Sequence, residues 1–373
     1  MYKIILVFSL VVLATLFCFV SCDDSTSSTK KILPVGEKAT PLTLENSGNS
    51  VMIVSVTIEG YEADEINLKY SVDGGEKQDI PSSGAPLISV GAGGTISFYG
   101  DRQEMTGSAR SYISITCSSD CYVYGNVMSL INSEDFASST SLENHPYAFY
   151  KLFLENSHLK NHKTKSLILP ATKLADWCYC EMFSFCEKLT EAPELPATTL
   201  TDNCYFSMFF NCAGLTKAPA LPARSLAASC YSWMFLNCSS LEKAPELPAT
   251  TLVANCYENM FGGCAKLAEA PELPAMDLVS NCYNGMFGDC TSLTKAPLLP
   301  ATTLADYCYW GMFQGCSNLT AVTCLATQTA NQATKKWLNG VASSGKFTKA
   351  ADADFWTTDA DGIPSGWESL VAK

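Results

Sequence analysis

The chain of 373 residues carries 24 Lys and Arg against 37 Asp and Glu, which gives a formal net charge of −13. This balance leaves no basic footprint for a phosphate backbone and argues against nucleic acid as a partner. The sequence has three histidines, and neither they nor any pair of carboxylates stand in a recognisable catalytic motif. We therefore expect a protein that is not an enzyme and needs no cofactor.

The first 21 residues have the pattern of a leader. Lys3 precedes a long apolar run that ends at Val20, and Ser21 and Cys22 follow. A basic start, an apolar stretch and a small residue before the cleavage point are typical of a signal peptide. The final FVSC resembles the end of a lipoprotein signal, with Cys22 as the lipidated first residue of the mature chain. An uncleaved membrane anchor is the alternative. Residues 22–32 are expected to form a flexible tether.

Residues 33–135 differ in character from the rest of the chain. β-branched runs such as SVMIVSVTIEG alternate with turn residues, and Asp73-Gly74-Gly75 is a hairpin signal. About seven short strands predict a β-sandwich-like domain. Cys117 and Cys121 lie in this region, and the sequence leaves open whether they form a disulfide.

Residues 145–324 repeat with a period of 26. A degenerate first unit has Leu152-Phe153 and Asn156 at places where six regular units carry Met-Phe and a cysteine. A fixed period of this length is the signature of a solenoid, whose units bury their apolar faces against each other. The regular units place two cysteines in two ladders. The first ladder is Cys178, Cys204, Cys230, Cys256, Cys282 and Cys308, and the second is Cys186, Cys212, Cys238, Cys264, Cys290 and Cys316.

The spacing within one unit predicts a short helix. Leu252, Cys256, Met260 and Cys264 are four residues apart, and residues at this spacing share a helix face. The position before the Leu holds an N-cap type of residue in five units, and an Asp follows in a capping-box-like place in two of them. These residues are Thr199, Ser225, Thr251, Asp277 and Thr303, with Asp202 and Asp306.

After the second cysteine each unit reads L-x-x-A-P-x-L-P, for example from Leu241 to Pro248. This segment is too rich in proline for a helix, and proline cannot donate to a strand ladder, so we expect a short extended segment stacked in parallel on its copies. Strand and helix together predict an α/β solenoid of 26-residue units. Residues 325–373, which contain Trp337 and Trp367, are expected to form a C-terminal cap.

The repeated cysteines are best explained as buried structural thiols, because cysteine behaves as a small apolar side chain. Disulfides between neighbouring units are the alternative. A metal site is not expected, because two cysteines separated by seven residues, without histidine, lack the spacing of a zinc site.

The pattern MF-x-x-C followed by L-x-x-A-P resembles the BspA-type leucine-rich repeats of bacterial cell-surface proteins. The longer LPATTL…CYxxMFxxC form is similar to a repeat family in surface lipoproteins of gut Bacteroides, and the resemblance covers all six regular units. It implies a leucine-rich-repeat-like solenoid on a lipid-anchored protein of the outer membrane, exposed at the cell surface. Asp23 and Asp24, directly after Cys22, look like the acidic surface-export signal of such lipoproteins.

Two sets of residues that vary between otherwise matched units are candidates for binding. The first is a column of charges in the strand segments: Glu191, Lys217, Lys243, Glu269 and Lys295. The second is a set of large aromatics in the predicted helices, at places where sister units carry Asn, Ser or Gly: Trp177, Phe206, Trp233, Tyr307 and Trp310. Solvation of the charges and packing of the aromatics between units are the plain structural alternatives.

These observations favour a surface-anchored protein for adhesion or protein–protein interaction, whose partner is a protein or glycan on a host or neighbouring surface. Attachment to the membrane would depend on the lipid, since no basic amphipathic helix is evident. The alternative is a glycan-binding lipoprotein for nutrient capture, and a hydrolase with unrecognised paired carboxylates is a third reading.

Overall fold

The computed structural model describes residues 39–60, 68–81, 85–101, 111–359 and 361–373. The expected leader, its Cys22 and the tether lie outside these residues. In the described part of the chain no helix has the length and apolar character needed to cross a membrane.

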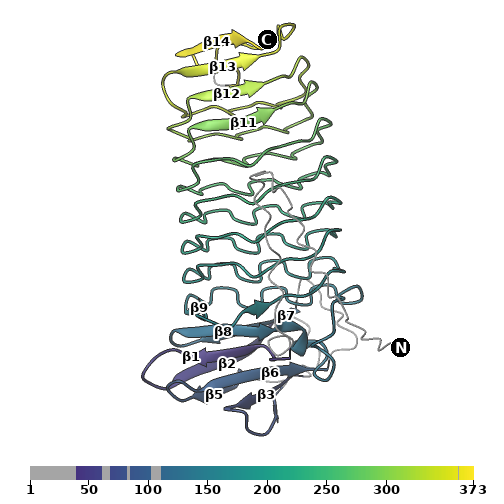
Figure 1. Ribbon diagram of the computed structural model, residues 1–373, viewed down its shortest axis with the longest axis vertical. Coiled ribbons are helices and arrows are strands. Elements are labelled where there is room, and N and C mark those ends of the chain that lie inside the picture. The colour runs from purple at the N-terminus through teal and green to yellow at the C-terminus, as the bar shows by residue number, and fades with distance from the viewer. Residues whose placement is uncertain (1–38, 61–67, 82–84, 102–110, 360) are drawn as a thin grey trace, which may run out of the picture. The chain divides into compact units, whose positions relative to one another are not determined.

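The N-terminal region consists mainly of antiparallel strands, which form two sheets among the described residues (Figure 1). One sheet has the order β5-β2-β7, and the other has the order β10-β8-β1-β6-β3-β4 with β9 also paired to β8. Alternate residues of β6 are buried, as the two-residue period of a half-buried strand requires. The strands are β1 Thr43–Asn46, β2 Met52–Gly60, β3 Leu68–Val72, β4 Gln78–Asp79, β5 Leu87–Val90, β6 Thr95–Gly100, β7 Ser111–Cys117, β8 Cys121–Asn126, β9 Leu159–Asn161 and β10 Leu167–Ile168.

The repeat region is a solenoid of stacked turns. It begins on β8, because β9 and β10 pair with that strand in parallel. Farther along, single parallel bridges join Glu191 to Lys217 and Lys217 to Lys243. Four strands then form a continuous parallel sheet: β11 Lys295–Leu299, β12 Ala321–Cys324, β13 Gly345–Lys349 and β14 Trp367–Val371. The predicted solenoid with briefly paired parallel strands is confirmed, and its parallel pairing continues into the segment expected to be a cap.

The predicted helices of the repeat are wrong. The segment from Cys178 to Cys186 and its copies consist of successive turns, and the one helix among the described residues is η1, a 3-10 turn at Val127–Leu130. Every fourth residue of these segments has a positive φ, as at Trp177 (61°), Glu181 (53°) and Phe185 (62°). A left-handed residue at every fourth position interrupts a right-handed helix. The four-residue spacing therefore reflects a four-residue turn, repeated along the segment.

The backbone hydrogen bonds of these segments alternate between two directions. The N–H of Tyr179 donates to the carbonyl of Cys204 in the next turn of the solenoid at 3.0 Å. The next N–H, of Cys180, donates to the carbonyl of Trp177 three residues back at 3.2 Å. One set of bonds joins neighbouring turns and the other closes the local turn, so a segment with a buried inner side keeps its backbone groups paired without a helix.

The residues predicted to cap helices join neighbouring turns instead. Thr199 forms a parallel bridge with Ser225, and Thr251 forms one with Asp277. The carboxylate of Asp202 accepts from the N–H of Ala228 at 2.9 Å, one turn farther along the stack. These side chains and strand contacts satisfy backbone groups between units, where a cap would satisfy them within one unit.

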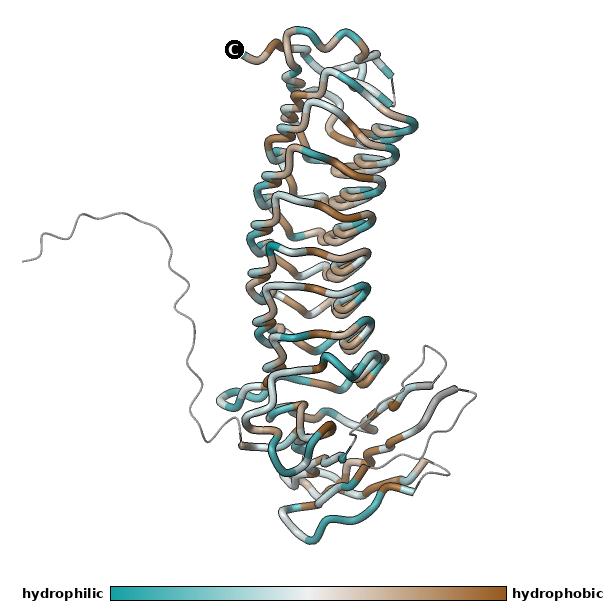
Figure 2. Tube along the Cα trace, turned by 90° about the vertical axis from the view of Figure 1, so that its right-hand side faces the viewer, coloured by the Kyte–Doolittle hydropathy of each residue, from teal (hydrophilic) through white to brown (hydrophobic). Residues whose placement is uncertain are grey.

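Hydrophobic residues recur at the same places in successive turns (Figure 2), and their buried side chains make up the interior of the solenoid. The repeated Tyr and Phe rings form two stacked columns. Tyr179 and Tyr205 lie 5.8 Å apart between ring centroids, and Phe209 and Phe235 lie 5.6 Å apart with an interplanar angle of 3°. Stacking at this distance stabilises the core beyond the effect of burying each ring. Trp337 extends the Tyr column by stacking on Tyr309 at 6.2 Å.

Both cysteine ladders are buried, and all sixteen described cysteines are free thiols. This supports the interpretation as core thiols over disulfides between units. The second ladder also makes a regular contact, because each thiol donates to the carbonyl of a Phe in the preceding turn, as from Cys264 to Phe235 at 3.2 Å. In the degenerate unit Asn156 replaces this cysteine, and its side-chain amide donates to the carbonyl of Ile115 at 3.1 Å. Burial raises the pKa of Cys178 to about 12, so such thiols are poor nucleophiles.

Cys117 and Cys121, whose pairing the sequence leaves open, stand at the end of β7 and the start of β8. Their sulfur atoms are 3.1 Å apart and both are free thiols. Asn156 contacts the Cys117 sulfur at 3.7 Å, so this pair lies against the first turn of the solenoid.

Candidate binding surfaces

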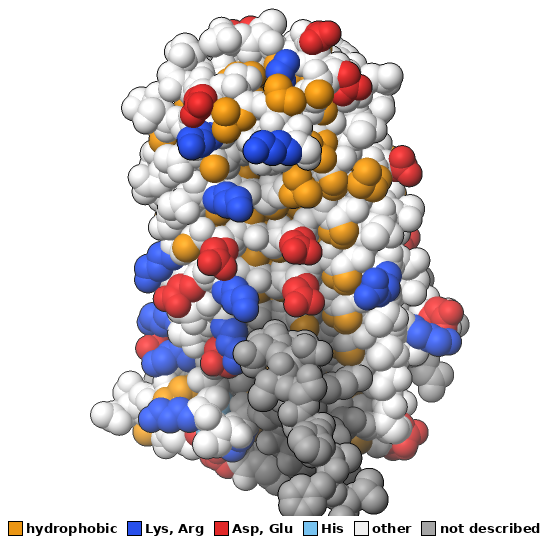
Figure 3. Space-filling view, turned by 45° about the horizontal axis from the view of Figure 1, so that its top comes forward, with side chains coloured by type: hydrophobic (Ala, Val, Ile, Leu, Met, Phe, Trp, Pro, Cys, Tyr) orange, Lys and Arg blue, Asp and Glu red, His pale blue; other side chains and the backbone are white. Residues whose placement is uncertain are grey.

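The charged column predicted from the strand segments is present on one face of the solenoid. Glu191, Lys217, Lys243, Glu269 and Lys295 are all exposed. Lys217 and Glu191 form an ion pair at 3.7 Å, but their side chains are 70% and 59% exposed, so the pair contributes little to stability. Figure 3 shows that acidic and basic side chains are interspersed on this face. The face therefore offers no strong field of one sign to a charged partner.

A line of backbone hydrogen bonds across the turn segments fixes which residues of successive turns are neighbours. Ser207 donates to Ser232, Trp233 to Glu258, Asn259 to Asn284, and Gly285 to Trp310, at 2.7–2.9 Å. We name this line the central row. It runs through the residue pairs 206–207, 232–233, 258–259, 284–285 and 310–311. The predicted aromatics Phe206, Trp233 and Trp310 all belong to it.

Six aromatic residues form a contiguous surface around the first part of the central row. We name them the aromatic patch: Tyr147, Trp177, Phe185, Phe206, Phe210 and Trp233. Tyr147 stacks on Trp177 with centroids 5.8 Å apart, and Phe206 stacks on Trp233 at 6.0 Å. Trp177 contacts Phe206 at 6.2 Å, Phe210 contacts Trp233 at 6.3 Å, and Phe185 meets Phe210 edge-on at 5.2 Å. Trp233 is 37% exposed, and the other five rings are partly exposed.

Tyr307 and Trp310 lie three turns beyond Trp233 and form a separate pair. Their rings meet edge-on at 6.2 Å, and Trp310 is 39% exposed. The structure thus divides the five predicted aromatics between two places. It unites Trp177, Phe206 and Trp233 in the patch and sets Tyr307 and Trp310 apart.

Three of the five predicted aromatics occupy left-handed backbone positions, as do Tyr147 and Phe185 of the patch. Trp177, Trp233 and Tyr307 have φ values of 61°, 59° and 57°. A bulky residue is unusual in this region, and the conformation costs roughly 1–2 kcal/mol for a residue with a Cβ. Neighbouring turns carry Asn203, Asn259 and Asn281 at the same positions, and Asn tolerates this conformation better. The large rings are therefore held where the backbone favours small polar residues.

Two carboxylates of the turn segments lie in partly buried surroundings. Desolvation raises the pKa of Glu181, although Lys151 lies 3.6 Å away and opposes the shift. Desolvation also raises the pKa of Glu258 in the central row, and among the described residues no side chain donates to its carboxylate. Glu181 and Glu258 lie three turns apart along the stack, so they do not form a catalytic pair.

A cluster around Asp120 is a feature that the sequence does not indicate. Asp120, in the turn between β7 and β8, contacts Lys160 at 3.0 Å, His158 at 3.1 Å and also Lys188. The hydrogen bond from Lys188, with those from His158 and Lys160, holds the pKa of Asp120 well below its usual range. These partners come from the first units of the solenoid, so the cluster ties the β7–β8 turn to the repeats. No spacing in the sequence brings the four residues together.

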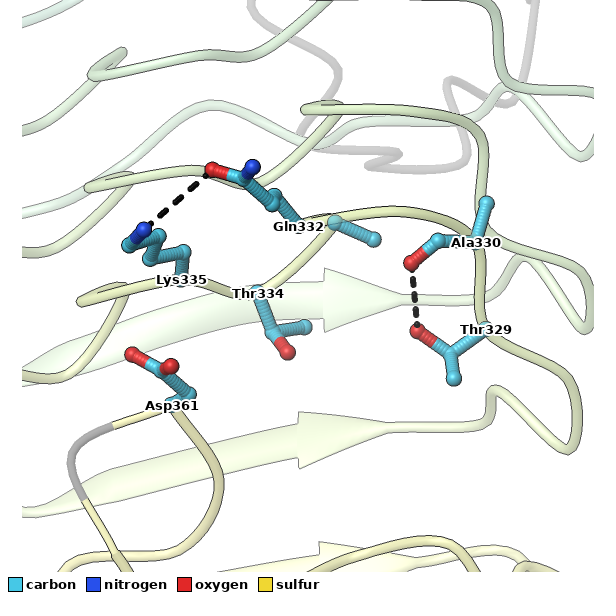
Figure 4. Close-up of a pocket in the computed structure, with 7 residues that line it drawn as sticks. Thr329, Ala330, Gln332, Thr334, Lys335 and Asp361 are labelled. Carbon is cyan, nitrogen blue, oxygen red and sulfur yellow. Dashed lines mark hydrogen bonds between the residues drawn. The ribbon is translucent and has the colours of Figure 1, made fainter.

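A shallow depression of about 330 Å³ lies near the C-terminal end of the solenoid (Figure 4). Lys335 donates to Gln332 at 3.4 Å, and Asp361 accepts from the N–H of Lys336 at 2.9 Å. The carboxylate of Asp361 is thus engaged by the backbone, and Lys335 is the one other titratable residue of the lining, which forms no recognisable catalytic arrangement. Among the residues that the structure describes, no cluster of His, Cys, Asp or Glu has the geometry to hold a metal ion.

No family model, no curated protein and no solved structure matches this chain.

Proposed function

We propose that the chain is a non-enzymatic lipoprotein of the outer membrane, attached through Cys22 and exposed at the cell surface, where its solenoid binds a partner protein in adhesion. The leader sequence and the resemblance of the repeats to bacterial surface proteins support the location. We also infer that the two N-terminal sheets are the layers of a β-sandwich that carries the solenoid, as the pattern of strands over residues 33–135 suggests.

The aromatic patch is the observation that carries this proposal. Trp and Tyr dominate the energetically important centres of protein interfaces, because each ring gives a large rigid contact area with few rotatable bonds. The patch presents six contacting rings, and Trp177 and Trp233 keep left-handed conformations that the repeat elsewhere gives to smaller residues. Packing against each other accounts for part of their burial, and the exposed remainder is available to a partner.

The test is binding of the full chain, purified in detergent, to parallel arrays of extracellular matrix proteins and mucins. The repeat supplies conservative variants. Trp177→Asn and Phe206→Ser install the residues that the next unit carries, Asn203 and Ser232. We expect each to weaken protein binding at least about tenfold, which corresponds to about 1.4 kcal/mol. Lys217→Glu is the control on the charged face.

Saturable protein binding that survives both patch variants and is lost on Lys217→Glu would transfer the function to the charged face. No saturable protein binding at all would refute the proposal. Thermal unfolding of each variant should be measured alongside, so that a loss of binding is not mistaken for a loss of fold.

A further inference from the structure

The central row brings two exposed tryptophans into one line with a polar stretch between them. Trp233 donates its N–H to the carbonyl of Glu258 at 2.8 Å, and Gly285 donates to the carbonyl of Trp310 at 2.8 Å. The bond from Asn259 to Asn284, at 2.7 Å, joins the two intervening turns. Backbone hydrogen bonds thus join the four successive turns from that of Trp233 to that of Trp310.

The stacked Phe rings of these turns give the distance between the turn of Trp233 and the turn of Trp310. Phe235, Phe261, Phe287 and Phe313 belong to the same four turns, and their centroids step by 5.7, 5.8 and 5.6 Å. The turns of Trp233 and Trp310 therefore lie roughly 17 Å apart, given the near-parallel stacking of these rings. This is the length of a few linked hexose rings.

The residues between the two indoles are polar or small, and they are less exposed than the two tryptophans. Glu258 and Asn259 are partly exposed, while Asn284 and Gly285 are buried. The Glu258 carboxylate has no donor among the described side chains, and it is partly withdrawn from water. A half-buried acceptor gains more from a ligand hydroxyl than a fully solvated one does, because less water competes for it.

We infer that the surface from Trp233 to Trp310 binds a linear neutral oligosaccharide, which stacks one sugar ring on each indole and donates hydroxyls to Glu258 and Asn259 between them. The electron-rich face of an indole attracts the C–H groups of a pyranose ring, which carry partial positive charge. Amide and carboxylate oxygens between two such platforms fix the orientation of the sugar hydroxyls.

This chemistry fits a glycan better than it fits a protein. The core of a protein interface is a contiguous, desolvated apolar centre with few charged residues. Here the indoles stand apart, with a carboxylate and amides between them. Among the described residues the ring of Trp310 contacts one other aromatic ring, the edge of Tyr307, and 39% of Trp310 stays exposed at a place where the three preceding turns carry Ser232, Glu258 and Asn284. The inference goes beyond the adhesive role of the patch and shares only Trp233 with it.

The experiment is isothermal titration of the full chain in detergent with linear oligomers of glucose, galactose, mannose or N-acetylglucosamine, two to six units long. For the sugar that binds, we expect affinity to rise with length until the oligomer reaches both indoles and then to level off. Trp233→Asn and Trp310→Asn install the residues of the neighbouring turns, Asn259 and Asn284. Each should weaken binding of the longest oligomer at least about tenfold, or about 1.4 kcal/mol.

Leu298→Ala is the matched control, because Leu298 is a large apolar side chain that is 54% exposed in β11, outside the central row. It should leave oligosaccharide binding unchanged. The inference is overturned if no oligomer of the panel binds, or if binding is insensitive to both tryptophan variants. The inference would also be overturned if Trp310→Asn weakened binding to a protein and left oligosaccharide binding unchanged, since the central row would then be a protein contact. Trp177→Asn tests the patch without touching this site, so the two proposals can fail separately.

Discussion

Replacement of Gly285 by Ala should lower the free energy of unfolding if the repeat consists of turns and raise it if the repeat were helical. Gly285 has a φ of 60°, and a Cβ at this position would lie 2.1 Å from the side-chain oxygen of Asn259 in the preceding turn. The left-handed conformation costs Ala roughly 1–2 kcal/mol. Displacement of the Asn259 side chain from its rotamer adds about 0.5–1.5 kcal/mol. We expect a loss of about 1.5–3.5 kcal/mol, whereas Gly→Ala inside a helix would add about 0.8–1 kcal/mol.

The assay is urea unfolding followed by circular dichroism, in which the midpoint should fall by about 1 M for an unfolding slope of 2–3 kcal/mol/M. A double-mutant cycle with Asn259→Gly isolates the contact between the two turns. Without the Asn259 side chain, the cost of Gly285→Ala should drop to the backbone part, about 1–2 kcal/mol. A gain in stability would restore the helical interpretation. An equal cost in both backgrounds would show that Asn259 does not lie over Gly285.

Two further predictions concern the core and the Asp120 cluster. Cys264→Ala should cost about 1–3 kcal/mol in urea unfolding, because it removes the thiol bond to Phe235 and leaves a small cavity, while Cys264→Ser keeps a donor and should lose less. Equal losses for Ala and Ser would mean that the thiol only fills space. The folded-state pKa of Asp120 is lowered, so its contribution is fully present above the unfolded pKa near 4 and is lost as pH falls toward the folded value. Asp120→Asn should therefore flatten the fall in melting temperature from pH 4 to pH 2. Parallel profiles for the two proteins would refute the role of this carboxylate.

The sequence predicted the solenoid correctly and its local structure incorrectly, and one measurement of periodicity explains both results. A helix turns 100° per residue, so positions four apart drift by about 40° at each step, and by about 120° from Leu252 to Cys264. The four apolar positions of each unit keep their spacing of four without the occasional three that a helix needs to stay on one face. A strict period of four is thus a property of the repeated turn.

A second signal for the turns was present in the residues before the apolar positions. Asn255, Asn259 and Gly263 stand four apart, as do Asn281, Gly285 and Asp289. Asn, Asp and Gly are the residues that occupy left-handed positions most readily, and all six of these have a positive φ. These columns predict turns, and they also show why Trp177, Trp233 and Tyr307 are exceptional.

The candidate sites were only partly predictable. Comparison between units found Trp177 and Phe206 because sister units have small residues there, but it missed Phe185 and Phe210. Those two join the patch only when each turn is folded back every four residues, which the helical interpretation did not provide. The Asp120 cluster could not be predicted for a different reason. Asp120 lies in the turn before β8 and its partners come from two separate units, so that only the tertiary structure brings them together.

The buried and the exposed positions of each turn have separate roles, and this explains how the fold can carry more than one binding surface. The buried Tyr, Met, Phe and Cys columns and the bonds between neighbouring turns recur in every unit, so the stack is stabilised by contacts that do not depend on the exposed residues. The exposed positions can then differ from turn to turn at a local cost of roughly 1–2 kcal/mol where a bulky residue takes a left-handed position. Trp233 bears that cost in full, whereas at the same position of the next two turns Asn259 bears less of it and Gly285 none. If Trp233→Asn weakened ligand binding but left the free energy of unfolding unchanged or higher, the ring would be retained for its ligand. If Trp233→Asn lowered the free energy of unfolding by more than the loss of its ring contacts explains, the patch would be part of the core.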